Sequence, residues 1–163
     1  MLLRITNKLA QKLKEMPLPD ETVSAESPLD EWYGNLFTWN RTQYIIFTNA
    51  HSLYSVILPG KGINNPYRLV QAAVIALSEA MKHEGYDDFL NMILKYTSNI
   101  TISKTISRSV LGSMNDMVFI AKTFLSADPE MDLYEISHRI NNTPYKYGRD
   151  YSHPSEEIKK LLI

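Results

Sequence analysis

The sequence contains no cysteine among its 163 residues. This absence excludes disulfide bonds, thiolate zinc sites and cysteine nucleophiles, and it fits a reducing compartment. No apolar run approaches the roughly 20 residues that a transmembrane helix needs. Residues 1–13 carry charged side chains along their length and lack the apolar centre of a signal peptide. We therefore expect a cytoplasmic protein with no membrane partner.

Acidic residues are missing from two long stretches, although the net charge of the whole chain is only −1. One stretch lies between Trp32 and Ser78, and the other lies between Phe89 and Asn115. Folding could bring the cations of these stretches together, or the stretches could be buried strands that exclude charge of either sign. The cations are Arg41, Lys61, Arg68, Lys95, Lys104 and Arg108.

Hydrophobic residues make up 44% of the chain and charged residues 21%, which is typical of a globular domain. Three apolar runs with short polar links predict an antiparallel meander, at 32–39, 43–48 and 53–58. The second run does not alternate, so we expect a strand covered on both faces. Further short strands are predicted at 2–5 and, with one face in solvent, at 100–104.

Apolar periodicity and capping signals predict several helices, at about 7–15, 66–84, 87–96, 109–126 and 132–141. Residues 16–29 are predicted to form a mobile loop, and 144–163 a tail with a short terminal helix. The predicted fold class is α+β, in a single domain over residues 1–163. It has a mostly antiparallel sheet of about four to five strands packed against helices.

Small and polar residues crowd the predicted junction between a strand and a helix at 104–116. Backbone N–H groups at a helix start lack partners within the helix, so such a junction attracts anions. Lys104 and Arg108 add positive charge, and Ser109 adds a hydroxyl. We predict that an anionic small molecule, a nucleotide or a nucleic acid binds there, with Asn115 and Asp116 pointing inward.

The polar face of this helix has two unusual members. Phe119 lies between Asn115 and Asp116 on the helical wheel, which predicts that the face is covered or lines a groove. Gly112 costs up to ~1 kcal/mol relative to alanine, which predicts a close backbone approach, either by a neighbouring strand or by a ligand. The alternative is a structural brace, in which Ser109 caps the helix, Asn115 and Asp116 bind the backbone of a nearby loop, and Arg108 pairs with Asp116.

Three segments carry a resemblance to a known family, namely 4–9, 30–36 and 108–116, with a looser match at 136–144. They resemble a family of small bacterial proteins with a domain of unknown function, often encoded on plasmids or other mobile elements. The family pattern has asparagine before the arginine, where this chain has Ser107. The resemblance implies a single domain and a shared feature made by Trp32, Tyr33, Asn35, Arg108, Ser109, Asn115 and Asp116.

Other motifs are incomplete. Glu135 and His138 lie three apart, but no partner motif completes a metal site, so no metal and no cofactor are expected. The sequence 59–62 lacks the full phosphate-loop pattern. In the tail, tyrosines alternate with cations at 145–151, where they either stack bases or pack on the domain. Whether the protein is an enzyme stays open, and a structural or interaction protein of a mobile-element system is the alternative function.

Overall fold

The computed structural model describes residues 1–17 and 23–163. The strands are β1 (Leu2–Ile5), β2 (Glu31–Trp39), β3 (Thr42–Asn49), β4 (Ser55–Pro59), β5 (Thr101–Lys104), β6 (Tyr145–Tyr147) and β7 (Asp150–Ser152). The helices are α1 (Asn7–Leu13), α2 (Pro66–His83), α3 (Phe89–Leu94), α4 (Arg108–Ala127), α5 (Leu133–Asn141) and α6 (Pro154–Leu161). The class is α+β, as predicted, and no helix of the described ranges is long and apolar enough to cross a bilayer.

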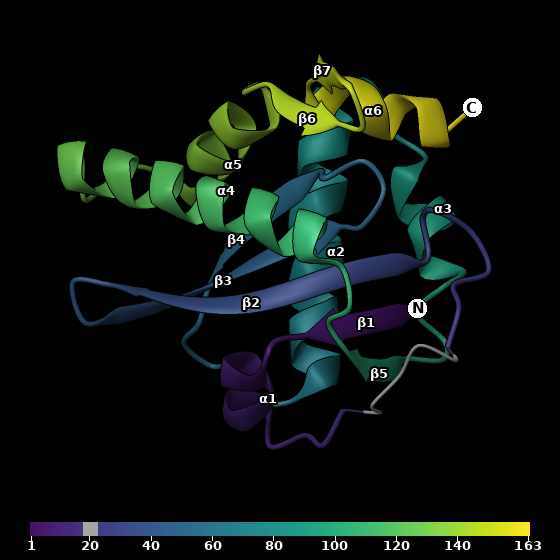
Figure 1. The fold of residues 1–163 in the computed structure, drawn as a ribbon, viewed down its shortest axis with the longest axis horizontal. Helices are drawn as coiled ribbons and strands as arrows, with labels where there is room; N and C mark the ends of the chain where they lie inside the picture. The colour runs from purple at the N-terminus through teal and green to yellow at the C-terminus, as the bar shows by residue number, and fades with distance from the viewer. Residues whose placement is uncertain (18–22) are drawn as a thin grey trace.

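The main sheet has five strands in the order β4-β3-β2-β1-β5 (Figure 1). Strands β2, β3 and β4 form the predicted antiparallel meander. Strand β1 runs parallel to both of its neighbours, β2 and β5. The prediction of a mostly antiparallel sheet is therefore wrong, and the sheet is mixed. The reason is that β1 and β5 join the sheet through long connections, which allow parallel pairing, whereas short links force antiparallel pairing.

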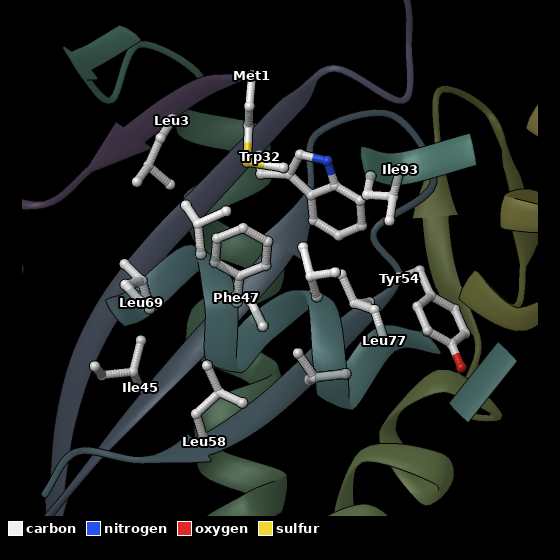
Figure 2. Packing of buried hydrophobic residues seen from close by; sticks show 14 of the residues in the cluster. Met1, Leu3, Trp32, Ile45, Phe47, Tyr54, Leu58, Leu69, Leu77 and Ile93 are labelled. Carbon is white, nitrogen blue, oxygen red and sulfur yellow. The ribbon is translucent and has the colours of Figure 1, made fainter. Parts of the chain in front are cut away.

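Helices cover both faces of this sheet, with α4 in front of it and α2 behind it in Figure 1. Alternation along β2 divides the core, since Trp32 packs in the α2 cluster and Tyr33 in the α4 cluster. In the α2 cluster, Trp32 stacks on Phe47 with ring centroids 5.1 Å apart, and helix α2 packs against both (Figure 2). The expectation that β3 is covered on both faces is confirmed, because Ile45 and Ile46 are both buried, one in each cluster.

Helix α2 begins where the sequence predicts. The Asn65 side chain accepts a hydrogen bond from the Arg68 N–H at 2.9 Å, and Pro66 opens the first turn. Gly85, with a φ of +90°, follows the helix in the left-handed conformation that glycine allows. The face of α2 that packs on the sheet contains Leu69, Ala73, Leu77 and Met81.

Helix α5 covers the outer edge of β4. Asn141 binds the Ser55 backbone twice, accepting from its N–H at 2.8 Å and donating to its carbonyl at 2.7 Å. Ser137 accepts from the Ile57 N–H at 2.9 Å. The next outward-facing position along β4 is Pro59, which has no N–H. Side chains of α5 therefore replace the hydrogen bonds that another strand would make.

The C-terminal region contains a β6–β7 hairpin that the sequence analysis missed, followed by the predicted terminal helix, α6. Tyr145 is buried in the α4 cluster, and the Tyr147 hydroxyl donates to the Ser52 carbonyl at 2.6 Å. Tyr151 is exposed. Two of the three tyrosines therefore anchor the hairpin on the domain. Residues 18–22 of the predicted loop 16–29 lie outside the described residues.

The close contact between Gly60, which follows β4, and the backbone of β3 can be tested by substitution. A Cβ atom there would lie 2.8 Å from the Gln43 carbonyl oxygen, which already accepts a hydrogen bond from the Gly60 N–H. Because backbone atoms are in the way, we expect Gly60→Ala to lower the free energy of unfolding by about 1–3 kcal/mol in urea denaturation.

The matched control is Gly112→Ala, because a Cβ atom at Gly112 meets nothing within 4 Å. It should stabilise α4 by up to ~1 kcal/mol. Equal effects of the two substitutions would contradict this account of Gly60.

Candidate functional site

The start of α4 is held by Ser107 and Tyr33. The Ser107 hydroxyl accepts a hydrogen bond from the Val110 N–H at 3.1 Å, and the Ser107 N–H donates to the Tyr33 hydroxyl at 3.1 Å. The helix therefore begins one residue earlier than predicted, and the alternative in which Ser109 caps it is wrong. Ser107 is therefore the residue that caps α4.

Two backbone donors stay open at this helix start. Within the described residues, neither the Arg108 N–H nor the Ser109 N–H has a hydrogen-bond partner, and both residues are exposed. The Arg108 and Lys104 side chains are exposed, and neither they nor Asp116 form an ion pair with any described residue. The expected Arg108–Asp116 pair of the bracing alternative is therefore not formed. Two cations and two amide donors remain available to an anion.

The junction lies where the connections that follow two adjacent strands, β1 and β5, lead to opposite faces of the sheet. Strands β1 and β5 are adjacent and parallel, and each is followed by a helix. Helix α1 after β1 packs in the α2 cluster, whereas α4 after β5 packs in the opposite cluster. The two connections thus leave adjacent strand ends toward opposite faces of the sheet. In open α/β sheets, such a switch point opens a crevice at the carboxyl ends of the strands, where ligands bind.

A cavity of about 370 Å³ lies beside this switch point. Lys104 lines it together with polar residues of α1 and one acidic residue, Glu15. The lining residues are Asn7, Ala10, Gln11, Glu15, Met16, Pro17 and Lys104. Of the predicted site residues, Lys104 is the member that lines this cavity.

The polar face of α4 is open to solvent. Phe119 is 72% exposed, so the prediction that this face is covered is wrong. In the described ranges, nothing beyond its chain neighbours and the adjacent backbone of α4 lies within 4 Å of the Gly112 Cβ position, so the predicted approach of a neighbouring strand is wrong. The approach of a ligand at Gly112 stays a prediction. Asn115 and Asp116 are exposed one to two turns beyond the helix start. Asp116 lies toward the hairpin, where burial first and the Asp116 charge second raise the pKa of Tyr145.

The three predicted site residues of β2 lie in different surroundings and do not form one site. Trp32 belongs to the α2 cluster and donates its indole N–H to the Leu29 carbonyl at 2.8 Å, so it lies on the far face from α4. Tyr33 contacts the junction through Ser107. The Asn35 amide oxygen accepts from the Thr6 hydroxyl at 2.8 Å, and Thr6 caps α1. Tyr33 and Asn35 therefore position the two helix starts on either side of the switch point.

Arg4, Glu31 and His51 form a polar cluster that the sequence analysis missed. Arg4 is only 2% exposed, although it lies between Leu3 and Ile5 in β1. Its Nε donates to Glu31 Oε1 at 2.6 Å, and His51 Nε2 lies 3.6 Å from Glu31 Oε2. The three side chains line a cavity of about 470 Å³ together with Ile106 of the junction. A lone charge within an apolar strand was the signal in the sequence.

Further hydrogen bonds of Arg4 join separate parts of the described chain. Its Nη1 donates to the Ser103 hydroxyl at 3.3 Å and to the Lys104 carbonyl at 3.1 Å, and its Nη2 donates to the Val23 carbonyl at 2.9 Å. The guanidinium thus fixes the end of β5 from within the sheet. Ser103 is fully buried by this contact, so the predicted solvent face of β5 is wrong at this position. Arg4 acts on the junction by holding it, since its donors are occupied.

Glu135 and His138 of α5, which the sequence leaves without a partner motif for a metal site, each contact another side chain. Glu135 pairs with Arg139, with Glu135 Oε1 and Arg139 Nε 2.8 Å apart, and His138 Nδ1 lies 3.9 Å from a carboxylate oxygen of Glu84. In the described ranges, no group of three or more His, Asp or Glu side chains is arranged to hold a metal ion.

Comparison with known proteins places the chain in a family. Residues 2–157 match the domain of unknown function DUF6933. The chain belongs to this family. No curated protein matches it. Among solved structures, it is similar to the HTLV-2 integrase catalytic core domain, solved in a trimeric form in complex with magnesium, with 9% sequence identity and a TM-score of 0.49. That match covers 82% of this chain and 99% of the other.

The Arg4–Glu31 pair predicts a large stability effect. Removing the carboxylate takes away the charge-assisted hydrogen bond that Glu31 Oε1 accepts from the buried guanidinium, so we expect Glu31→Ala to lower the free energy of unfolding by about 1.5–3 kcal/mol. Glu135→Ala is the control, because it breaks an exposed pair on α5 and should cost less than ~0.5 kcal/mol. Urea denaturation compares the two, and similar losses would show that the buried pair contributes little.

Proposed function

We propose that this protein binds an anionic ligand, a nucleotide or a nucleic-acid phosphate, where β5 passes into α4. The switch point between β1 and β5 carries the proposal. It lies at the only pair of adjacent strands in the described sheet whose following helices cover opposite faces after parallel pairing. Ligands of open α/β sheets bind outside such strand ends.

The chemistry of the junction suits a phosphate. The open Arg108 and Ser109 N–H groups lie at the positive end of a 20-residue helix, and the Arg108 guanidinium begins in the same turn. Lys104 supplies a second cation from the neighbouring cavity. Charge-assisted hydrogen bonds of this type are the strong ones in anion sites. The neutral balance of the whole chain, with a net charge of −1, leaves recognition to these local groups.

In this proposal the residues of the original prediction have different roles. Lys104, Arg108 and Ser109 contact the ligand, while Tyr33 and Asn35 hold the helix starts in place. Gly112, Asn115 and Asp116 lie further along the exposed face of α4, where only an extended ligand such as a nucleic acid would reach them. Trp32 supports β2 from the opposite core.

An interaction protein is the second candidate function. Exposed apolar side chains favour it, since Phe119 stands open on α4 and four others gather around α2 and α3. In this reading the polar junction braces the fold. The resemblance to bacterial proteins of plasmids and other mobile elements suggests a cytoplasmic setting in which the partner is another product of the same element.

Titration of the purified protein with pyrophosphate, ATP and a short single-stranded DNA tests the first candidate. We expect Arg108→Ala to weaken binding about tenfold or more, because a hydrogen bond to a charged group contributes about 1.5–3 kcal/mol. The unfolding free energy should change by less than ~0.5 kcal/mol, since Arg108 is exposed. Isothermal titration calorimetry and urea denaturation measure the two effects.

Lys82→Ala is the matched control, because it removes an exposed cation on α2, in the opposite layer, and should leave binding unchanged. Failure of all three probes to bind the unmodified protein at millimolar concentration would exclude this function. Equal binding by Arg108→Ala and the unmodified protein would exclude the site. A steep loss of DNA binding with added salt would identify nucleic acid rather than a nucleotide as the better ligand.

A further inference from the structure

Helix α2 exposes a second apolar face, directed away from the sheet. Tyr67 is 76% exposed and Ile75 54%, and across a groove from them Leu90 and Leu94 of α3 are 42% and 46% exposed. These four make up nearly half of the nine large apolar side chains that are exposed in the described ranges. Such clustering on one surface is typical of an interaction site.

The groove between α2 and α3 is a formed cavity of about 340 Å³. Its other lining residues include Val70, Val74 and Ile100. On the other side of α2, a second cavity of about 470 Å³ lies between α2, β4 and α5, and Ile75 lines both cavities. Helix α2 therefore stands as a ridge between two apolar grooves, which is the shape that helix-on-helix packing requires.

The inward face of α2 is already satisfied by the core, so this outer face needs another partner. Two large apolar side chains, Tyr67 and Ile75, stay exposed on this outer face among polar ones, which is typical of a contact surface with a polar rim. Within residues 1–17 and 23–163, no outer layer covers the exposed side chains of α2, whereas α6 lies beside its C-terminal end, where Lys159 Nζ is 3.3 Å from Glu84 Oε2. The unpaired part is the stretch from Tyr67 to Glu79.

We propose that this face is a homodimer interface, in which α2 packs antiparallel against α2 of a second copy. The argument is charge complementarity along the helix. Arg68 lies near the N-terminal end of the face and Glu79 near the other end, and both are exposed. At 100° per residue, Arg68, Ile75 and Glu79 fall within about 40° of one another on the wheel.

A two-fold axis between Gln71 and Ile75 brings Arg68 of each copy opposite Glu79 of the other. The same axis brings Gln71 of one copy within one residue of Ile75 of the other along the helix and directs Lys82 beyond the helix start, near Asn65. No like charges then meet on the helix. A face with opposite charges at its two ends is complementary to itself under two-fold rotation, which favours a second copy over an unrelated partner. In the described ranges, Glu79 forms no ion pair within its own chain.

Sedimentation velocity across the micromolar range tests the interface with the full chain. We expect a dimer whose dissociation constant rises at least about tenfold in Ile75→Glu, because the substitution places a charge at the centre of the contact. Phe119→Glu is the matched control on the opposite layer, since Phe119 is also highly exposed, and it should dimerise as the unmodified protein does. A protein that stays monomeric at every concentration overturns the proposal, as does Ile75→Glu that dimerises normally.

Charge exchange tests the antiparallel arrangement. Arg68→Glu should weaken the dimer by placing two carboxylates opposite each other at both ends, and adding Glu79→Arg should restore it. A double variant that stays as weak as the single one overturns the arrangement.

The absence of cysteine permits a direct distance test. Gln71→Cys should cross-link to its own copy with a short bis-maleimide, whereas Ser126→Cys on α4 should not. Cross-linking of neither variant, or of both equally, contradicts the two-fold packing of α2. Because these measurements involve no anion, their outcome is independent of ligand binding at the β5–α4 junction.

Discussion

The position of β1 between β2 and β5 is the constraint on which the rest of the structure depends. Its four residues, Leu2–Ile5, are all buried and pair on both sides. Strand β5 is the terminal strand on this side of the sheet, and β1 provides its pairing. Because β1 and β5 are parallel, their carboxyl ends lie at the same end of the sheet, and from there α1 and α4 lead to opposite faces. The junction considered as a ligand site therefore exists because β1 is inserted there.

Arg4 makes this insertion specific. A charge inside an apolar strand is costly unless each donor finds a partner. Arg4 finds them on both neighbouring strands and on the backbone at Val23. The planar guanidinium suits such divergent contacts better than an ammonium group would. The same side chain that fixes β5 also lines the cavity next to Ile106, so stability and the shape of the junction are coupled.

The local elements could be predicted from the sequence because their signals are local. Asn65 and Pro66 mark the start of α2, and the short polar links mark the meander. Parallel pairing of β1 could not be predicted, since four residues carry no information on which strands they join. The Ser107–Tyr33 hydrogen bond spans 74 residues of sequence and has no local signal either.

Two expectations about α4 were wrong for the same reason, namely that Phe119 is covered and that a neighbouring strand approaches Gly112. Phe119 and Gly112 were assigned a purpose because each is unfavourable on an exposed helix face. Exposed apolar residues are nevertheless common in folded proteins, and a single glycine costs little in a helix of 20 residues. The opposite error concerns Arg4, an unusual residue whose position in a buried strand did carry information. An unusual residue is therefore informative when it lies in a buried element, as Arg4 does, and much less so on an exposed helix face.

The covering of β4 by α5 has a consequence for the behaviour of the protein in concentrated solution. A free strand edge is a template on which another chain can add a strand, and it is the usual starting point of fibrillar aggregation. Here Asn141, Ser137 and Pro59 leave little of that template on β4, and the opposite edge strand, β5, has four residues and ends in a lysine. Addition of a further strand is thus blocked by α5 at β4 and disfavoured at β5 by the short length of that strand and its terminal charge.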